Sequence, residues 1–240
     1  MKSCIKSVVL AATLALGTFG SGLSGVSAAT VTPGTATVTA ADTAFSWTVN
    51  FICSAALPCN GGNPGVTLQA RAIFTLQAVT VVGSETFWDI GLVLRNNSFL
   101  SAGGFLTAMG FATDPDATLS GVWDANADGI NWAGGPGSIP GFGTTELCVF
   151  DGNNCAAANE QDMDPAQQDR IGFTLTTGLV DTLTFSDFAV KWAGVGLDGG
   201  SSYDAGGTIS VAPVPLPAAG GLLLAGLAGL ALLNRKRKAA

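Results

Sequence analysis

One stretch of this chain places oxygen-bearing side chains at alternate positions, a spacing typical of calcium-binding loops. Asp124, Asn126 and Asp128 occupy positions 1, 3 and 5 of such a loop, and a glycine follows at position 6. The twelfth position is Gly135 instead of the usual bidentate glutamate, so a calcium site here needs a carboxylate from elsewhere. The alternative is a turn whose Asp and Asn side chains bond their own backbone. The sequence leaves both interpretations open.

Two tryptophans, Trp123 and Trp132, bracket this loop. Exposed aromatic rings stack on sugars in carbohydrate-binding modules, so both are candidate sugar-stacking residues. The alternative is a packing role with one hydrogen bond from the indole N–H, which is the commoner use of tryptophan. The three other tryptophans, Trp47, Trp88 and Trp192, lie in strand-like runs and are expected in the core.

The chain contains no histidine. This excludes Ser-His-Asp and Cys-His nucleophilic machinery, a histidine general base and a histidine-ligated zinc site. Paired carboxylates of the kind used in glycoside hydrolysis remain formally possible, but no pair is singled out by its spacing. We therefore expect a protein that is not an enzyme and that has no cofactor, with Ca²⁺ as the one possible exception.

Four of the five cysteines follow residue 28, at Cys53, Cys59, Cys148 and Cys155. An even number of cysteines in an exported chain indicates disulfides, and four allow three connectivities. We favour the two local pairs, Cys53–Cys59 and Cys148–Cys155, each worth about 2–3 kcal/mol. A metal site is the rival interpretation, but the chain has no CxxC pair.

The elements that must hold these residues are strands. Apolar and polar residues alternate along many short runs, with Thr, Val and aromatic side chains enriched. The runs are Thr35–Thr39, Phe45–Ile52, Val66–Val82, Thr86–Arg95, Phe105–Phe111, Ile171–Thr176, Thr182–Trp192 and Thr208–Ala212. Gly83-Ser84 has the composition of a hairpin turn, and Thr177-Gly178 begins another. The expected fold is all-β, an antiparallel β-sandwich or jelly roll.

Residues 120–166 differ from the rest of this body. They contain few β-branched residues and many Gly, Asp and Asn residues. A stretch of this length without strands is either functional or mobile in most compact domains. We interpret it as a long ordered insertion held by Cys148–Cys155. Only Pro165–Asp169 suggests a turn of helix.

The body, residues 29–212, is strongly acidic. All 17 acidic residues lie within it against only four basic ones, so it carries 13 net negative charges. The basic residues are Arg71, Arg95, Arg170 and Lys191. A field of this sign repels nucleic acid and anionic membrane surfaces, so we expect no nucleic-acid partner.

Residues 1–28 have the layout of a secretory signal peptide. Lys2 and Lys6 precede an apolar stretch from Val8 to Leu16, and a small-residue cleavage site, Val26-Ser27-Ala28, follows. The apolar stretch is too short to span a membrane. The general secretion machinery is therefore the first expected partner, and the peptide is expected to be removed.

Residues 213–240 form a tail in three parts. A short motif, Val214-Pro215-Leu216-Pro217-Ala218, leads into an uncharged apolar run that ends at Leu233. The run from Pro217 spans about 25 Å as a helix, close to the thickness of a hydrocarbon core. The basic cluster Arg235, Lys236, Arg237 and Lys238 follows and marks a cytoplasmic end. We expect a single C-terminal transmembrane helix in the inner membrane.

This tail resembles the VPLPA variant of the PEP-CTERM sorting signal of Gram-negative bacteria. The resemblance implies recognition by exosortase, a membrane-embedded protease and transpeptidase. It also implies delivery to the cell surface or extracellular matrix, often in association with exopolysaccharide. The catalytic residues of this system belong to exosortase, so the resemblance assigns none to this chain.

The body resembles the cistern family of PEP-CTERM proteins. The residues that carry this resemblance are Leu94-Arg95-Asn96-Asn97-Ser98, the run from Met109 to Asp116, Asn131-Trp132 and Glu146-Leu147-Cys148 through Cys155. The family implies an exported, surface-associated protein and no particular activity.

Two functions are therefore expected. The first is a non-catalytic surface or matrix protein that is held in the inner membrane by its tail, facing the periplasm, and is then processed and released. The alternative is a calcium-assisted carbohydrate-binding module with polysaccharide as its partner.

Overall fold

The computed structural model describes residues 29–32, 34–57, 59–62, 64–99, 103–124, 130–152, 154–156, 163–195 and 201–210. Within these ranges the chain forms twelve β-strands in one nearly closed sheet, and every pairing is antiparallel. The all-β prediction is confirmed. The strands are β1 (Thr30–Thr32), β2 (Thr35–Thr39), β3 (Ser46–Cys53), β4 (Leu68–Val82), β5 (Glu85–Asn96), β6 (Gly103–Asp114), β7 (Thr118–Asp124), β8 (Trp132–Pro136), β9 (Leu147–Asp151), β10 (Gln168–Gly178), β11 (Thr182–Val195) and β12 (Ser201–Ser210).

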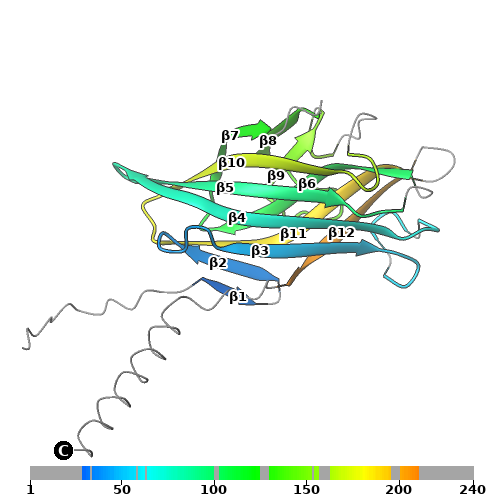
Figure 1. The fold of residues 1–240 in the computed structure, drawn as a ribbon, viewed down its shortest axis with the longest axis horizontal. Helices are drawn as coiled ribbons and strands as arrows, with labels where there is room; N and C mark the ends of the chain where they lie inside the picture. The colour runs from blue at the N-terminus through cyan, green and yellow to red at the C-terminus, as the bar shows by residue number, and fades with distance from the viewer. Residues whose placement is uncertain are drawn as a thin grey trace, which may run out of the picture.

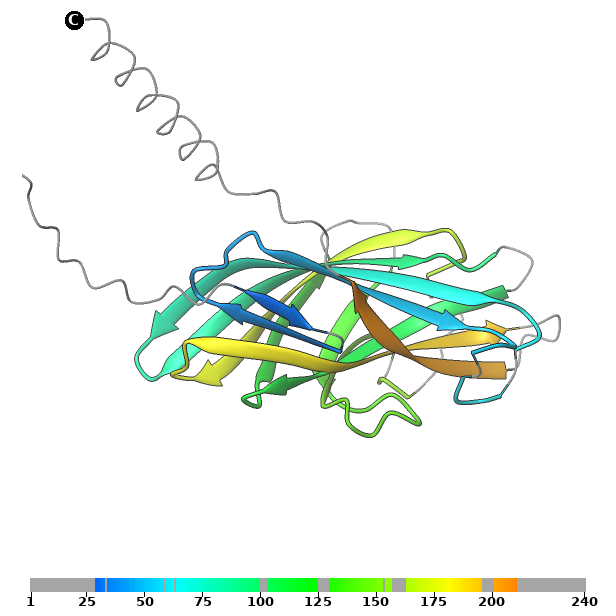
Figure 2. The same ribbon diagram turned by 90° about the horizontal axis from the view of Figure 1, so that it is seen from below.

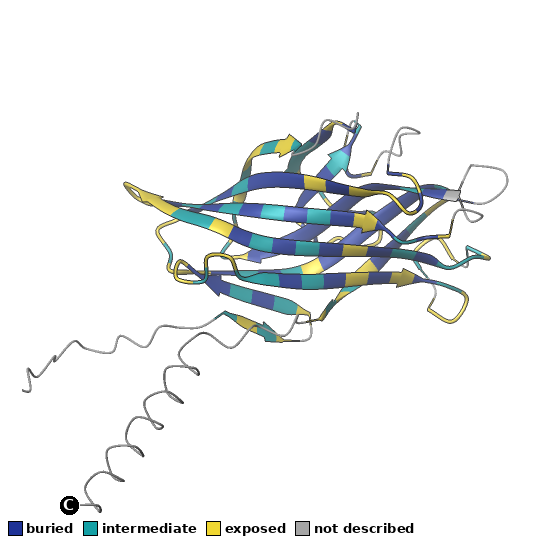
Figure 3. Ribbon diagram, in the orientation of Figure 1, coloured by how far each residue is buried: buried dark blue, intermediate teal, exposed yellow. Residues whose placement is uncertain are grey.

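The strands lie in two layers that face each other across the core (Figure 1). The front layer has the order β7-β10-β5-β4-β3, and the back layer contains β11, β6, β9 and β8, with β2 beside the first part of β11. Buried and exposed residues alternate along the front strands (Figure 3). This is the pattern of a sheet with one face on a core and one face in solvent.

Strand β12 joins the two layers. Its first half pairs with β11 and its second half, from Gly207 to Ser210, pairs with β3. Figure 2 shows β12, in orange, running obliquely from one layer to the other. A Cβ atom on Gly207 would collide with the side chains of Val49 and Phe51, so only glycine fits where the strand changes partner. At the far end of the sheet, side chains of β7 fill the space over Gly134 of β8.

Aromatic rings from both layers form the centre of the core. Trp47 of β3 stacks on Phe74 of β4 with ring centroids 5.2 Å apart. Phe185 of β11 contacts Trp47 at 4.9 Å, and Phe111 of β6 contacts Phe173 of β10 at 5.7 Å. Such aromatic pairs stabilise a core by more than the burial of their apolar surface alone. The expectation that Trp47, Trp88 and Trp192 are core residues is confirmed, since all three are fully buried.

The expected strands are all present, with ends that differ by up to three residues, except that β12 begins seven residues before the expected Thr208 and residues 211–212 lie outside the described ranges. The segment 120–166 contains the expected Cys148–Cys155 disulfide, but the expectation that it lacks strands is wrong. It contains most of β7 and all of β8 and β9. Strand β7 contains Gly121 and β8 contains Gly134 and Gly135, while β9 has only five residues, so a pattern based on alternating β-branched residues does not find these strands. The suggested turn of helix at Pro165–Asp169 is also wrong, because β10 begins at Gln168.

The Gly83-Ser84 hairpin is confirmed and joins β4 to β5 with Val82 opposite Glu85. The second expected hairpin, at Thr177-Gly178, is wrong. Strands β10 and β11, on either side of this turn, belong to different layers, and the chain crosses between them.

No helix in the described ranges is both long and apolar enough to cross a membrane. The expected signal peptide (1–28) and the expected tail helix lie outside the described residues.

Candidate functional site

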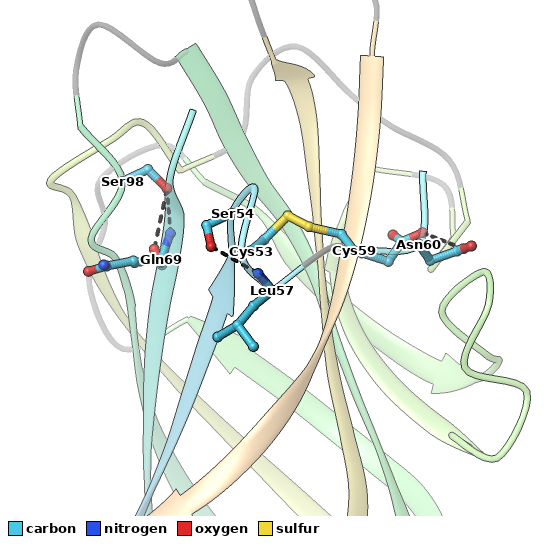
Figure 4. Close-up of a disulfide and its surroundings, with 8 residues drawn as sticks. Cys53, Ser54, Leu57, Cys59, Asn60, Gln69 and Ser98 are labelled. Carbon is cyan, nitrogen blue, oxygen red and sulfur yellow. Dashed lines mark hydrogen bonds between the residues drawn. A yellow bond between two sulfur atoms is a disulfide. The ribbon is translucent and has the colours of Figure 1, made fainter. Parts of the chain in front are cut away.

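Both expected disulfides form, as Cys53–Cys59 and Cys148–Cys155. The first closes a short loop directly after β3 (Figure 4). Within this loop the Leu57 backbone N–H donates to Ser54 Oγ at 3.2 Å. The Leu57 side chain remains 56% exposed. The disulfide therefore holds an apolar side chain at the surface, beside the outer face of the sheet.

The second disulfide lies in a small apolar cluster on the outer face of the back layer. Residues 137–146 fold over this face and bring Ile139 and Phe142 against Ala108, Ala189 and the two cysteines. Gly137 lies directly beside Cys155, where a Cβ atom would come within 2.8 Å of the sulfur. This cover shields the outward-facing residues of β6 and β11 from solvent.

A groove of about 660 Å³ lies between the first disulfide loop, the 137–146 cover and the outer faces of β3, β4 and β12. Its polar lining comes mainly from amide and hydroxyl side chains, and its apolar lining from Ile52, Leu57 and Phe142. The polar residues are Asn50, Asn60, Gln69, Asn97 and Thr208. Amides and hydroxyls both donate and accept hydrogen bonds, so the groove suits an uncharged, hydroxyl-rich ligand.

Asn60 fixes the geometry of this groove. Its backbone exchanges two 3.1 Å hydrogen bonds with the backbone of Asp204 on β12. Its side-chain amide donates to the carbonyl of Pro140 at 3.0 Å and to Asp204 Oδ2 at 3.3 Å. Gly141 leaves room for this amide, because a Cβ atom there would collide with Asn60. One residue thus ties the disulfide loop to β12 and to the cover.

A buried ion pair lies at the inner end of the groove. Lys191 Nζ is 3.8 Å from Asp204 Oδ1, and the two side chains are 6% and 5% exposed. Burial raises the pKa of the Asp204 carboxyl, while the Lys191 ammonium and the hydrogen bond from Asn60 act in the opposite direction. Among the described residues Asp204 Oδ1 has no hydrogen-bond partner, so the Lys191 ammonium is the main group that stabilises its charge. This pair has the surroundings of a structural pair and lies too deep to meet a large substrate.

The predicted calcium residues are only partly described. Asp124 is the last residue of β7, and Asn126 and Asp128 lie outside the described residues. Among the residues that are described, no three Asp, Glu, Cys or His side chains converge in a way that could hold a metal ion. The calcium loop therefore stays a prediction.

The two candidate stacking tryptophans have different surroundings. Trp123 on β7 is 42% exposed, and its indole lies over Gly172 of β10, where any Cβ atom would collide with the ring. Trp132 is only 6% exposed, and its indole N–H donates to the buried carboxylate of Asp169 at 2.5 Å. A ring buried in the core offers no face to a sugar, so the stacking prediction is wrong for Trp132 and remains open for Trp123.

The sorting-motif residues 214–218 and the basic residues 235–238 lie outside the described residues. The groove residues were not predicted. Asn50, Gln69 and Thr208 come from three strands, and they meet only because β3 pairs with both β4 and β12. The one available signal was that these polar residues occupy the solvent-facing positions of strands in which apolar and polar residues alternate.

No protein-family model, curated protein or solved structure matches this chain.

Proposed function

We propose that this chain is a non-catalytic exported protein of the surface or extracellular matrix of a Gram-negative bacterium. In this proposal residues 1–28 direct secretion, the tail forms a transmembrane helix in the inner membrane, and an exosortase-type enzyme processes it. The two-layered body then belongs to the β-sandwich class, with a jelly-roll-like crossing of strands between its layers. The polymer that it meets outside the cell is polysaccharide.

The observation that carries this proposal is the pairing of a VPLPA-type tail with a body that forms two local disulfides. Disulfides persist in oxidising compartments outside the cytoplasm. The groove supports a binding role, because its amide and hydroxyl lining lacks an accessible carboxylate pair. The one acid that lines it, Asp204, is buried against Lys191.

The test is the mass of the mature protein in a host that has an exosortase. The form recovered outside the cell should lack the signal peptide and the basic cluster and should end near residues 214–218. A Pro215→Ala variant should accumulate in the inner membrane with its tail intact. Extracellular protein that retains Ala240 would contradict the proposal, and so would a full-length cytosolic protein with reduced cysteines.

A second candidate function is a calcium-assisted carbohydrate-binding module. The observation that favours it is the exposed Trp123 immediately before Asp124. In this case calcium should raise the thermal unfolding midpoint of the protein and strengthen its binding to a neutral glycan such as dextran. Asp124→Asn should remove both effects. Identical midpoints in calcium and in chelator would reject this candidate.

A further inference from the structure

All three arginines in residues 29–212 lie on the outer face of the front layer. Arg71 of β4 is directly opposite Arg95 of β5, and Arg170 of β10 is opposite Val93, two residues along β5 from Arg95. All three are exposed. Directly opposed side chains in an antiparallel sheet have Cβ atoms about 5 Å apart. We call the surface formed by Arg71, Arg95 and Arg170 the arginine face.

None of these arginines is neutralised within the described part of the chain. The ion pair found there is Lys191–Asp204, which is buried at the inner end of the groove. The nearest outward-facing acid on the same strands is Asp89, which is six residues along β5 from Arg95, about 20 Å, and opposite Thr174, four residues along β10 from Arg170, about 13 Å. On the neighbouring strand β7, Asp124 is opposite Ile171, the residue after Arg170. Like charges directly opposite each other destabilise a sheet. The fold therefore keeps together three cations that have no ion pair with any described residue, at a local energetic cost, in a body with 13 net negative charges.

The arginine face is continuous with two other features of the same outer surface. On one side, the exposed indole of Trp123 lies over Gly172, two residues along β10 from Arg170. On the other side, Arg71 is directly opposite Asn50, which lines the groove. One strip of surface thus crosses the strands from an aromatic ring, through three guanidinium groups, to the amide-lined groove.

We propose that this strip binds an anionic polysaccharide whose sugar rings carry carboxylate or sulfate groups. Guanidinium groups form bidentate, charge-assisted hydrogen bonds with such groups. The Trp123 ring offers a stacking face for a sugar, and the groove amides pair with hydroxyl groups. A stable complex with a protein partner needs an apolar core in its interface. Between the arginines only Ile73 and Val93 face outward, and both are partly buried.

This inference deepens the proposed function, because it names the class of polysaccharide that the body binds. It rests on that function only for the assumption that the protein meets the polymer outside the cell. Its test uses the full-length chain in mild detergent, so it is independent of tail processing. The probes are alginate, which carries carboxylates, dextran sulfate, and unmodified dextran as the neutral polymer. Titration calorimetry is performed in chelator, so that binding through a calcium loop is excluded.

Arg95→Gln should weaken alginate binding about tenfold, because it removes a charge-assisted pair at the centre of the face. The alginate affinity of Arg95→Lys should lie between those of the wild type and Arg95→Gln, because lysine retains the charge but lacks the planar guanidinium group. Thr80→Glu is the matched control. It makes the same change in net charge at an exposed position of β4 that is about 30 Å along the strand from Arg71, and should alter affinity less than about twofold. Alginate should also change the emission of Trp123, an effect absent in Trp123→Ala.

Equal affinity for alginate and dextran would overturn the proposal, and so would equal losses in Arg95→Gln and Thr80→Glu. Binding of dextran sulfate but not of alginate would assign the site to sulfated glycans. If the protein binds neither alginate nor dextran sulfate but self-associates through Arg95, the occupant of the strip is a second copy of this chain and the polysaccharide proposal is rejected.

Discussion

Replacing Lys191 with methionine tests the energetics of the groove directly. Methionine retains the length of the side chain and removes its charge, which leaves Asp204 buried without a cation. Two unit charges 3.8 Å apart attract by about 4 kcal/mol at an effective dielectric constant near 20. Removal of one member of a buried pair costs about 3–5 kcal/mol. We expect a loss of this size at pH 7, a large share of an ordinary stability of about 5–15 kcal/mol.

The loss should depend on pH in a defined direction. Burial already raises the pKa of Asp204, and Lys191 opposes that rise, so the variant should have a still higher pKa at this carboxyl. An acid with a raised folded-state pKa destabilises the folded protein above that pKa. As the pH falls, the folded state takes up the proton before the unfolded state, whose pKa is about 3.9. The difference between the variant and the wild type should therefore shrink between pH 7 and pH 5.

Urea unfolding at both pH values measures these differences, with the buried tryptophans as fluorescent probes. The double variant Lys191→Met/Asp204→Asn is the control, because asparagine can still accept the hydrogen bond from Asn60 without carrying a charge. Its stability should recover to within about 2 kcal/mol of the wild type, and the large pH-dependent deficit of the single variant should be absent. A loss in Lys191→Met that is equal at both pH values would refute this account, as would a double variant no more stable than the single one.

Three other substitutions probe the fold and the position of the Trp123 indole. Gly172→Val should displace the Trp123 indole and increase quenching of tryptophan fluorescence by acrylamide; unchanged quenching would show that the ring does not lie on β10. Trp132→Phe should lower the free energy of unfolding by about 1–3 kcal/mol, because Asp169 loses a buried donor; equal stability would mean that this hydrogen bond is dispensable. Gly207→Val should cost about 1–3 kcal/mol through overpacking against β3, measured by urea unfolding; no loss would show that β12 has room there.

The alternation of residues predicted most strands but not the partners of those strands. Thr177-Gly178 has a turn-like composition, and the runs before and after it alternate well, so a hairpin was expected. In the structure the two strands do not pair with each other and belong to opposite layers. Periodicity identifies which face of a strand is apolar, and it is the same whether the next strand is a neighbour in the layer or lies in the opposite layer. The alternation pattern therefore does not show which strands belong to the second layer.

The arginine face depends on a β-bulge in β4 that the sequence pattern does not predict. Counting back from the Gly83-Ser84 turn in an unbroken ladder places Arg71 opposite Asn96. A β-bulge at Gln77 shifts the register by one residue and places Arg71 opposite Arg95. The apolar residues before and after the bulge allow either phase of alternation. A shift of one residue exchanges the two faces of a strand, so the grouping of charges was not predictable from spacing alone.

The net charge of the body and the arginine face favour ligands of opposite sign, for a reason of length scale. Thirteen excess negative charges suggest that polyanions are repelled. At physiological ionic strength, however, the Debye length is about 8 Å, so a bound group responds mainly to charges within that distance. Arg71 and Arg95 are side by side within this range, whereas Asp89 is about 20 Å from Arg95 along β5 and about 13 Å from Arg170 along β10. A carboxylate that reaches the arginine face therefore meets a positive surface, while the acidic remainder of the body slows its approach. Raising the salt concentration should then weaken the bound contacts and the long-range repulsion together, which predicts a shallower salt dependence than three isolated arginines would give.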